Sequence, residues 1–281
     1  MTAKKTASCS VSFEFFPPRD EEGRSRLINN VAAKLAQLQP EYFSVTYGAG
    51  GTTKDGTQQT VSELIAAGFD AAPHLSMGAD DSDDIRQMLD GYAAAGVKRI
   101  VALRGDQPSG FGASRFAHNA EALVRLIRDH SGDQFNIEVA AYPEVHPDAE
   151  GAQFDLDFFK RKVDAGADGA ITQYFYNADA YENFLERTAA AGITVPIVPG
   201  VMPITNLAAV LRFSEKCGAE VPRWLRQVLV DKQDDDQATL EFGVEMVTRL
   251  CQRLLALGAP GLHFYTLNRW GATTRICQNL N

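Results

Sequence analysis

The sequence predicts an α/β fold, and within that class a TIM (β/α)8 barrel. Short runs rich in β-branched and aromatic residues alternate with longer stretches of helical periodicity, a pattern typical of βα units repeated around a parallel sheet. Eight such runs occur in 281 residues, of which 45% are hydrophobic, so one large core can be buried. We therefore expect residues 1–281 to form a single domain, with residues 1–9 as a flexible N-terminus.

The expected elements follow in chain order. The eight strands are Val11–Phe16, Tyr42–Tyr47, Ala72–Ser76, Arg99–Leu103, Asn136–Tyr142, Ala170–Tyr174, Val195–Gly200 and Gly261–Leu267. Apolar residues at the 3.6-residue period predict helices over Ser82–Gly96 and Leu240–Leu254. The segment Val221–Gln237 is an extra element, in which Pro222 can open one helix and Asp234–Asp236 can cap the next.

Charge and cysteine usage narrow the class of function. The net charge of -9 argues against a general nucleic-acid or anionic-membrane surface and favours a small soluble substrate. The cysteines show neither close pairing nor zinc-ligand spacing; they are Cys9, Cys217, Cys251 and Cys277. We therefore expect reduced thiols, and a cytoplasmic location fits them. No apolar run follows Lys4 and Lys5, and no segment has the length of a membrane span, which agrees with that location.

A carboxylate interrupts the first apolar strand. Because side chains alternate along a strand, Ser12, Glu14 and Phe16 share one face. Burying an unpaired carboxylate is costly, so Glu14 either has a hydrogen-bonding partner or lies near the open end of the barrel. This strand alone favours a structural and a functional glutamate equally.

Polar residues also close or follow other strands. They are His74 in the third strand, Arg104-Gly105-Asp106 after the fourth, Tyr142 and His146 at the fifth, and Gln173 in the sixth. Barrel enzymes build their sites from the C-terminal ends of strands, so this recurrence predicts one shared pocket.

Several chemistries are disfavoured by missing motifs. The glycine-rich loop 48–53 has neither dinucleotide-binding nor P-loop spacing, and the five histidines form no HxH or HExxH. No expected strand ends in lysine, as a Schiff-base aldolase would favour, and the GxSxG elbow of serine hydrolases is absent. Acid/base or cofactor chemistry remains.

The motifs resemble a known family. They are Ser12-Phe13-Glu14-Phe15-Phe16-Pro17-Pro18, Val45-Thr46-Tyr47-Gly48-Ala49, Ala72-Pro73-His74-Leu75, Ala102-Leu103-Arg104-Gly105-Asp106, Ala141-Tyr142-Pro143-Glu144-Val145-His146-Pro147, Ile171-Thr172-Gln173 and His263-Phe264-Tyr265-Thr266-Leu267-Asn268-Arg269. In this order they resemble the methylenetetrahydrofolate reductase family, in its short bacterial type that consists of the catalytic domain only. The resemblance covers nearly the whole chain.

The resemblance implies an FAD-dependent oxidoreductase. NADH or NADPH would reduce the bound flavin and leave, and methylenetetrahydrofolate would then bind and be reduced to 5-methyltetrahydrofolate, which supplies methyl groups for methionine synthesis. The sequence does not decide between NADH and NADPH; the resemblance to short bacterial members suggests NADH, and no clamp for a 2′-phosphate is recognisable. The family also implies a homo-oligomer.

Residue roles follow from the same motifs. Glu14 would be the general acid that opens the folate's five-membered ring, and the catalytic Asp106 would stabilise the transient cation beside both flavin and folate. The flavin dinucleotide would contact Tyr47, Ala49, His74, Arg104, Gly105, Asp106, Ala117, Tyr142, His146, Ala149, Asp155, Arg161 and Lys162. Arg161 and Lys162 can also be interpreted as the solvated face of a helix.

The remaining implied contacts concern the nicotinamide and the folate. Gln173 would hydrogen-bond the folate ring and also approach the nicotinamide, which Thr46 would help to bind. Phe213 would stack on either ligand, and Arg269 and Asp106 would lie beside the folate. Two positions depart from the family pattern: Ala209 stands where a second folate-binding glutamine is usual, and Phe158 where an asparagine lies near the flavin.

Two other functions stay open from the sequence. A metal-free barrel lyase or aldolase would use Glu14 and Asp106 as an acid/base pair without flavin. A folate-binding or subunit-interaction module would need the strand-end carboxylates to be structural.

Overall fold

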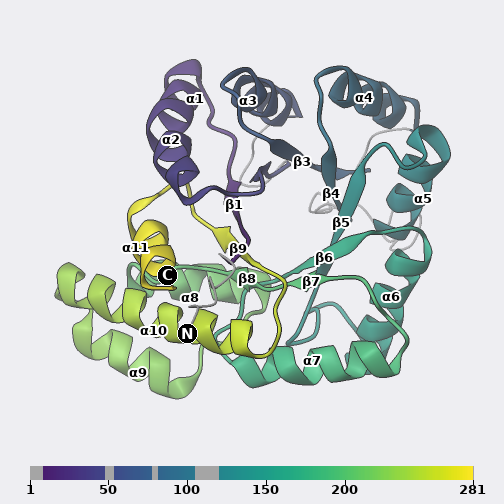
Figure 1. Cartoon of the computed structure of the whole chain (residues 1–281). Coiled ribbons are helices and arrows are strands. Elements are labelled where there is room, and N and C mark those ends of the chain that lie inside the picture. The colour runs from purple at the N-terminus through teal and green to yellow at the C-terminus, as the bar shows by residue number, and fades with distance from the viewer. Residues whose placement is uncertain (1–8, 48–53, 78–81, 105–119, 281) are drawn as a thin grey trace, which may run out of the picture.

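A ring of parallel strands forms the centre of the computed structural model, which describes residues 9–47, 54–77, 82–104 and 120–280, and helices surround that ring (Figure 1). The strands are β1 Val11–Phe15, β2 Phe43–Val45, β3 Ala71–Ser76, β4 Arg99–Leu103, β5 Asn136–Ala141, β6 Gly169–Thr172, β7 Ile197–Val198, β8 Gly200–Val201 and β9 Leu262–Tyr265. All the expected strands are present, several of them one to three residues shorter than predicted.

The sequence prediction was wrong about the seventh strand. The expected single strand Val195–Gly200 is divided into two short strands, β7 and β8. The sheet order is β7-β6-β5-β4-β3-β2-β1-β9-β8, and every pairing is parallel. Proline has no N–H to donate to a ladder, and at Pro199 the chain changes partner from β6 to β9. The Pro199 carbonyl still accepts a bond of 3.1 Å from the His263 N–H. Since both edges of the sheet belong to one continuous segment, the eight predicted strand positions close into a barrel.

The helices lie between the strands along the chain, and the extra helix expected after Pro222 is present. They are α1 Glu21–Arg26, the π-helical turn η1 Leu27–Ala32, α2 Ala33–Leu35, the 3₁₀ turn η2 Ala36–Leu38, α3 Lys54–Ala66, α4 Ser82–Ala94, α5 Ala120–Ser131, α6 Ala152–Asp164, α7 Ala178–Ala190, α8 Leu207–Cys217, α9 Arg223–Lys232, α10 Asp236–Ala256 and α11 Gly271–Leu280. Pro222 precedes α9, and the Asp235 side chain caps α10 by accepting from Ala238 N at 2.9 Å. Both local predictions are confirmed.

Side-chain alternation divides each strand between two environments. The rings of Phe13 and Phe43, at 5.9 Å, belong to the apolar layer between the sheet and the helices, as does Phe264, whose ring is 5.9 Å from that of Phe13. The other face of β1 turns toward the barrel axis and carries Ser12 and Glu14. The interior of this barrel is therefore polar.

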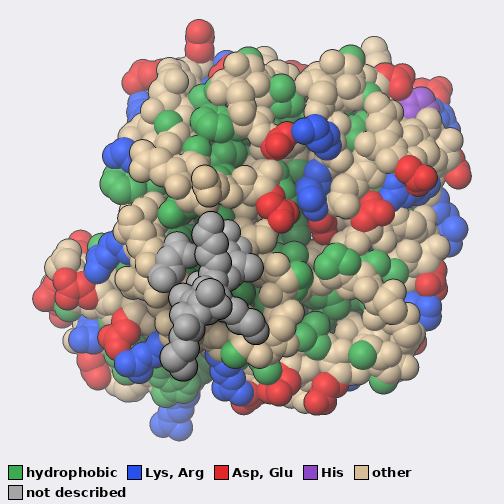
Figure 2. Space-filling model, viewed as in Figure 1, with side chains coloured by type: hydrophobic (Ala, Val, Ile, Leu, Met, Phe, Trp, Pro, Cys, Tyr) green, Lys and Arg blue, Asp and Glu red, His purple; other side chains and the backbone are tan. Residues whose placement is uncertain are grey.

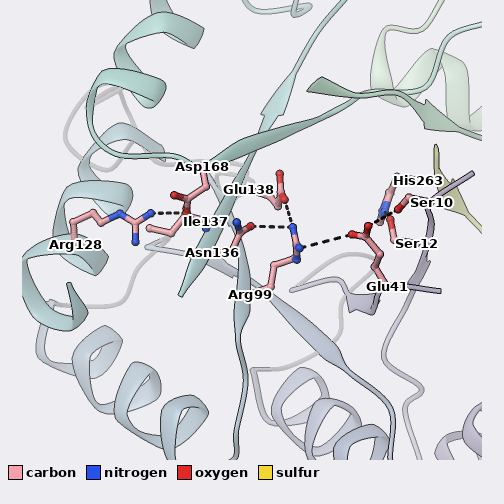
Figure 3. A network of polar contacts seen from close by, with 10 residues as sticks. All are labelled: Ser10, Ser12, Glu41, Arg99, Arg128, Asn136, Ile137, Glu138, Asp168 and His263. Carbon is pink, nitrogen blue, oxygen red and sulfur yellow. Dashed lines mark hydrogen bonds and ion pairs between the residues drawn. The ribbon is translucent and has the colours of Figure 1, made fainter. Parts of the chain in front are cut away.

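A charged network fills the N-terminal end of the barrel (Figure 3). Arg99, the first residue of β4, forms an ion pair with the buried Glu138, donates to Asn136 Oδ1 at 2.9 Å and lies 3.8 Å from Glu41. Its guanidinium also covers the Tyr42 ring at 4.5 Å. Burial raises the pKa of Glu138, and the charge of Arg99 opposes that rise. Side-chain alternation places charged residues in the interior at the N-terminal end of the barrel, and this network pairs them with one another.

The states of the cysteines and the character of the helices agree with the expectations from the sequence. All four cysteines are free thiols, and Cys251 and Cys277 are buried. Among the described helices, none combines the length and the apolar character needed to cross a membrane. Residues 1–8 of the expected flexible N-terminus lie outside the described residues, whereas Cys9 packs against the core.

The seam of the barrel leaves no room for a side chain at Gly200. A Cβ there would lie 2.2 Å from the Thr172 carbonyl oxygen and 2.5 Å from the Tyr265 ring. We expect Gly200→Ala to lower the free energy of unfolding by about 2 kcal/mol or more, measured by urea denaturation. Gly271→Ala, where the added Cβ meets open space, is the control and should change it by less than about 0.5 kcal/mol. Equal stabilities would contradict this account of closure.

Candidate active site

Three strands bring ionisable side chains together inside the barrel. Glu14 of β1 lies between His74 of β3 and His263 of β9: its Oε2 is 3.4 Å from His74 Nε2 and 3.6 Å from His263 Nε2. The three side chains are 12%, 7% and 0% exposed, respectively. Glu14 thus lies beside two imidazoles without a hydrogen bond to either, and a small part of it is accessible.

Burial determines the charge of His74. It lowers the pKa of the His74 imidazole to about 4, with the negative charge of Glu14 opposing the shift and His263 adding to it. At neutral pH the ring is uncharged, so its contact with Glu14 is not an ion pair. Among the described residues, the Nε2 atoms of His74 and His263 have no partner in hydrogen-bonding geometry.

Hydrogen bonds fix the backbone around Glu14. Thr266 Oγ1 donates to the Glu14 carbonyl at 2.7 Å. The Asn268 side chain bonds both the N–H and the C=O of Phe16, each at 2.9 Å, as a neighbouring strand would. Leu267 and Asn268 adopt positive φ angles of 52° and 57°, which turn the chain after β9 toward β1. Sequence reasoning assigned no role to Thr266 or Asn268, because their contacts are with β1 and the residue that follows it, 252 residues away in the chain, and follow only from the pairing of β9 with β1.

The end of β6 adjoins the same interior. Gln173 Oε1 accepts from Tyr174 N at 3.0 Å, and the Tyr265 hydroxyl donates to the Thr172 carbonyl at 2.7 Å. Burial raises the pKa of Tyr265, and the charge of Glu14 raises it further. Tyr265 is therefore an uncharged donor beside Glu14 that sequence reasoning did not single out.

A second group of expected site residues lies around the end of β5. The Tyr142 and His146 rings meet edge to face at 4.5 Å. His146 N donates to Asp155 Oδ2 at 3.1 Å, and His146 Nδ1 accepts from Asp148 N at 3.0 Å. Arg104, which follows β4, joins this group through Asp148 at 2.8 Å. Burial and the charge of Arg104 lower the pKa of His146.

Lys162 and Arg161 differ although they are adjacent on α6. Lys162 is buried, so its interpretation as part of a solvated face is wrong: Nζ donates to the Ala140 carbonyl at 2.5 Å. Burial lowers its pKa to about 8, which leaves it mostly protonated at pH 7. Arg161 is exposed and pairs with Glu121 at 2.6 Å, on the side of α5. The ring of Phe158 lies 5.9 Å from Lys162 Nζ.

The other expected site residues are distributed around these groups. Thr46 Oγ1 is buried without a hydrogen-bond partner among the described residues, and burial raises the pKa of Tyr47 to about 12. Phe213 packs partly buried on α8, and Arg269 is exposed just after β9. Ala149 N donates to the His146 carbonyl at 2.9 Å. Ala49, Gly105, Asp106 and Ala117 lie outside the described residues.

A parallel barrel with ionisable side chains gathered inside it and around its strand ends defines a barrel enzyme. The family model for methylenetetrahydrofolate reductase matches residues 1–281. The 5,10-methylenetetrahydrofolate reductase of Escherichia coli (strain K12) is 39% identical over 279 residues, which cover 99% of this chain and 93% of that protein. The chain belongs to the methylenetetrahydrofolate reductase family and is an oxidoreductase.

Two further comparisons support the placement. Methylenetetrahydrofolate reductase (NADH) 1 of Arabidopsis thaliana is 36% identical over 287 residues, which cover 96% of this chain and 48% of that longer protein. An uncharacterized protein from Clostridium thermocellum that binds two copies of 5-methyl-5,6,7,8-tetrahydrofolic acid has the same fold: the TM-score is 0.70 at 18% identity, and the match covers 97% of this chain and 94% of that one.

The lowered pKa of His74 predicts an acid-labile contribution to stability. Because its folded-state pKa of about 4 lies below the ordinary 6.5, the unfolded chain binds the proton more readily. Stability should fall as the pH drops below 6.5, and this single contribution approaches about 3 kcal/mol below pH 4. Urea unfolding between pH 4 and 7 should show a shallower loss for His74→Asn than for the wild type. Parallel pH dependences would refute the assignment.

Proposed function

We propose that this chain reduces 5,10-methylenetetrahydrofolate to 5-methyltetrahydrofolate with NADH or NADPH as the donor and FAD as the bound cofactor. The observation that carries the proposal is the Glu14 carboxyl group, held inside the barrel of a methylenetetrahydrofolate reductase family member at 3.4 Å from an uncharged imidazole. When bound, the flavin would supply hydride transfer between the nicotinamide and the folate.

Glu14 has the position of a proton donor. Opening the five-membered ring of the substrate breaks a carbon–nitrogen bond and leaves its electron pair on the departing amine nitrogen, and a proton delivered to that nitrogen makes it a better leaving group. Its side chain is 12% exposed, so the substrate can reach a carboxyl group that is otherwise shielded from water. The proposed general acid is therefore largely buried and still accessible in part.

The residues around β5 fit a flavin dinucleotide. An ammonium group has three donors, and the acceptor of Lys162 among the described residues is one carbonyl oxygen, so this buried cation has donors left for an anion. Arg104 and the pair of Tyr142 and His146 lie in the adjoining group. Lys162 and Arg104 would bind the diphosphate, and the aromatic pair would cover an adjoining part of the flavin dinucleotide.

Other expected roles follow from the same family membership. We infer that Gln173, Phe213, Arg269 and Asp106 contact the folate, and that Thr46 contacts the nicotinamide. NADH is favoured as the donor, since the A. thaliana relative carries it in its name. Arg161 is the weakest of the flavin assignments, because its guanidinium pairs with Glu121 on the outer surface.

The wider setting is also proposed. We infer a single catalytic domain, a cytoplasmic location, a homo-oligomer, and a role in supplying methyl groups for methionine synthesis. Acidic and basic side chains are interspersed over the face shown in Figure 2. Together with the net charge of -9, this distribution supports a small-molecule substrate rather than a nucleic acid or a membrane.

Replacing the proposed acid should separate the two half-reactions. We expect Glu14→Gln to leave flavin reduction by NADH within about threefold of the wild type and to slow flavin reoxidation by methylenetetrahydrofolate by about a hundredfold or more. Anaerobic stopped-flow absorbance measures both steps. Glu22→Gln, at a side chain that is 85% exposed, is the control. Equal losses in both steps would remove Glu14 from the acid role, and a protein that binds no flavin would remove the whole proposal.

Lys162 should control flavin affinity. We expect Lys162→Met to raise the dissociation constant for FAD by about tenfold or more, whereas Lys160→Met, at a residue paired with Asp164 on the exposed side of α6, should not change it. Fluorescence titration of the apoprotein measures both constants. Unchanged affinity in Lys162→Met would contradict the assignment.

The same variant tests the burial of the cation without any cofactor. Because the folded-state pKa of about 8 lies below the ordinary 10.5, the unfolded chain binds the proton more tightly between these values. Wild-type stability should therefore rise from pH 8 to 10.5, and Lys162→Met should lose that rise in urea denaturation. A rise that persists would place Lys162 in contact with water.

A further inference from the structure

We propose that His263, anchored by Ser12, is a positioning residue that holds one oxygen of the Glu14 carboxyl group and leaves the other to carry the proton to the substrate. This inference rests on the proposed role of Glu14 as the acid. It gives a chemical role to Ser12 and His263, two interior residues from opposite ends of the chain.

The ring of His263 is fixed from several sides. Ser12 and His263 are partners in the β1–β9 ladder and lie side by side in Figure 3. Ser12 Oγ is 2.7 Å from His263 Nδ1. The Tyr42 ring stacks on the imidazole at 6.1 Å, and the Tyr265 ring meets it edge-on at 5.4 Å. The imidazole has no exposed surface, and its Nε2 lies on the Glu14 side, 3.6 Å from Oε2.

The direction of the hydrogen bonds follows from the donors. A side-chain hydrogen bond links Tyr42 and Ser12, and burial raises the pKa of Tyr42, so the phenol keeps a proton that it can donate to Ser12. The Ser12 hydroxyl can then donate to His263 Nδ1, and in a singly protonated imidazole this places the ring proton on Nε2. The opposite tautomer would turn the Nε2 lone pair toward the Glu14 carboxylate. All donors therefore run from Tyr42 toward Glu14, an order in which successive bonds strengthen one another.

Both histidines approach the same carboxyl oxygen. Nε2 of His74 and Nε2 of His263 lie 3.4 and 3.6 Å from Glu14 Oε2. These distances are slightly longer than a hydrogen bond, as is common before a substrate tightens a site. The two N–H groups would hold Oε2 as the acceptor, so the proton of the acid resides on Oε1. When it is delivered, the O–H bond breaks, an N–H bond forms on the substrate, and the electron pair stays on the carboxylate.

His263 differs from His74 in having an anchor. Its second nitrogen is bound to a hydroxyl group, and no such bond is found for His74 among the described residues. The other titratable groups facing this unit are Tyr265 on β9, and, toward the N-terminal end, Glu138 on β5 with its partner Arg99 on β4. Glu138 and Arg99 neutralise each other, so the field at His263 changes little while that pair is intact.

Two substitutions of similar size, His263→Asn and His263→Gln, distinguish the role of Nε2 from that of Nδ1. The amide of glutamine can present its N–H near the place of Nε2, whereas that of asparagine reaches only the place of Nδ1. We expect His263→Asn to slow flavin reoxidation by methylenetetrahydrofolate about a hundredfold and His263→Gln to restore about tenfold of that loss. Flavin reduction by NADH should stay within about threefold in both. His130→Asn, on the outer helix α5, is the control for loss of a histidine.

The pH profile distinguishes positioning from a structural role. Without donors on Oε2 the carboxylate form is less stable, so the pH at which folate reduction is half-maximal should move up by about one unit in His263→Asn. A purely structural residue would lower the rate without moving the profile. An unmoved profile, or equal rates for the asparagine and glutamine variants, would overturn the proposal.

Ser12→Ala covers the case in which the His263 variants fail to fold. It removes only the anchor, and we expect a roughly threefold to tenfold slower folate step. Side-chain ¹⁵N spectra of the wild type should show His263 protonated at Nε2 and not at Nδ1. The reverse tautomer would overturn the proposal. If Glu14→Gln leaves folate reduction at the wild-type rate, the acid assignment fails first; if only the His263 and Ser12 variants behave as wild type, this inference fails alone.

Discussion

Closure of the parallel barrel is the constraint on which the rest of the structure depends. Once β7 and β8 join the two edges of the sheet at Pro199, alternate residues of every strand must point into one narrow interior. In this chain those residues are largely polar: β1 contributes Ser12 and Glu14, and β9 contributes His263. Each is costly to bury alone, so the interior is stable only if these side chains are partners of one another or of a ligand.

The two ends of the interior meet that requirement differently. At the N-terminal end, Arg99 forms an ion pair with Glu138 and donates to Asn136, so the charges are paired, while Glu138 Oε2 has no hydrogen-bond partner among the described residues. Nearer the C-terminal end, buried polar atoms are left without hydrogen-bond partners among the described residues, including His74 Nε2 and Thr46 Oγ1. An unsatisfied buried group costs about 1–3 kcal/mol, so this end carries a stability cost that binding a polar substrate or cofactor can offset. The charged network around Arg99 and the proposed acid Glu14 thus lie at different levels along the barrel axis.

Much of the candidate site follows from strand positions in the sequence. Glu14 and His74 are predicted from their places in strands one and three, and the structure brings them within 3.4 Å of each other. Arg161 and Lys162 show the limit of such reasoning: they are adjacent and chemically similar, yet one pairs with Glu121 at the surface and the other is buried against Ala140. Which side of α6 faces the sheet depends on packing, and two neighbouring cations give no local signal of it.

By itself the sequence determined the βα alternation, the eight strand positions, the caps of α9 and α10, and the polar face of β1, because each depends on residues within a few positions of one another. Only the tertiary structure decided that Ser12 and His263, separated by 251 residues, share a hydrogen bond, and that the seventh strand divides at Pro199. Both depend on which strands become neighbours when the barrel closes. Side-chain alternation specifies the face of a strand, whereas strand pairing and register specify the partner.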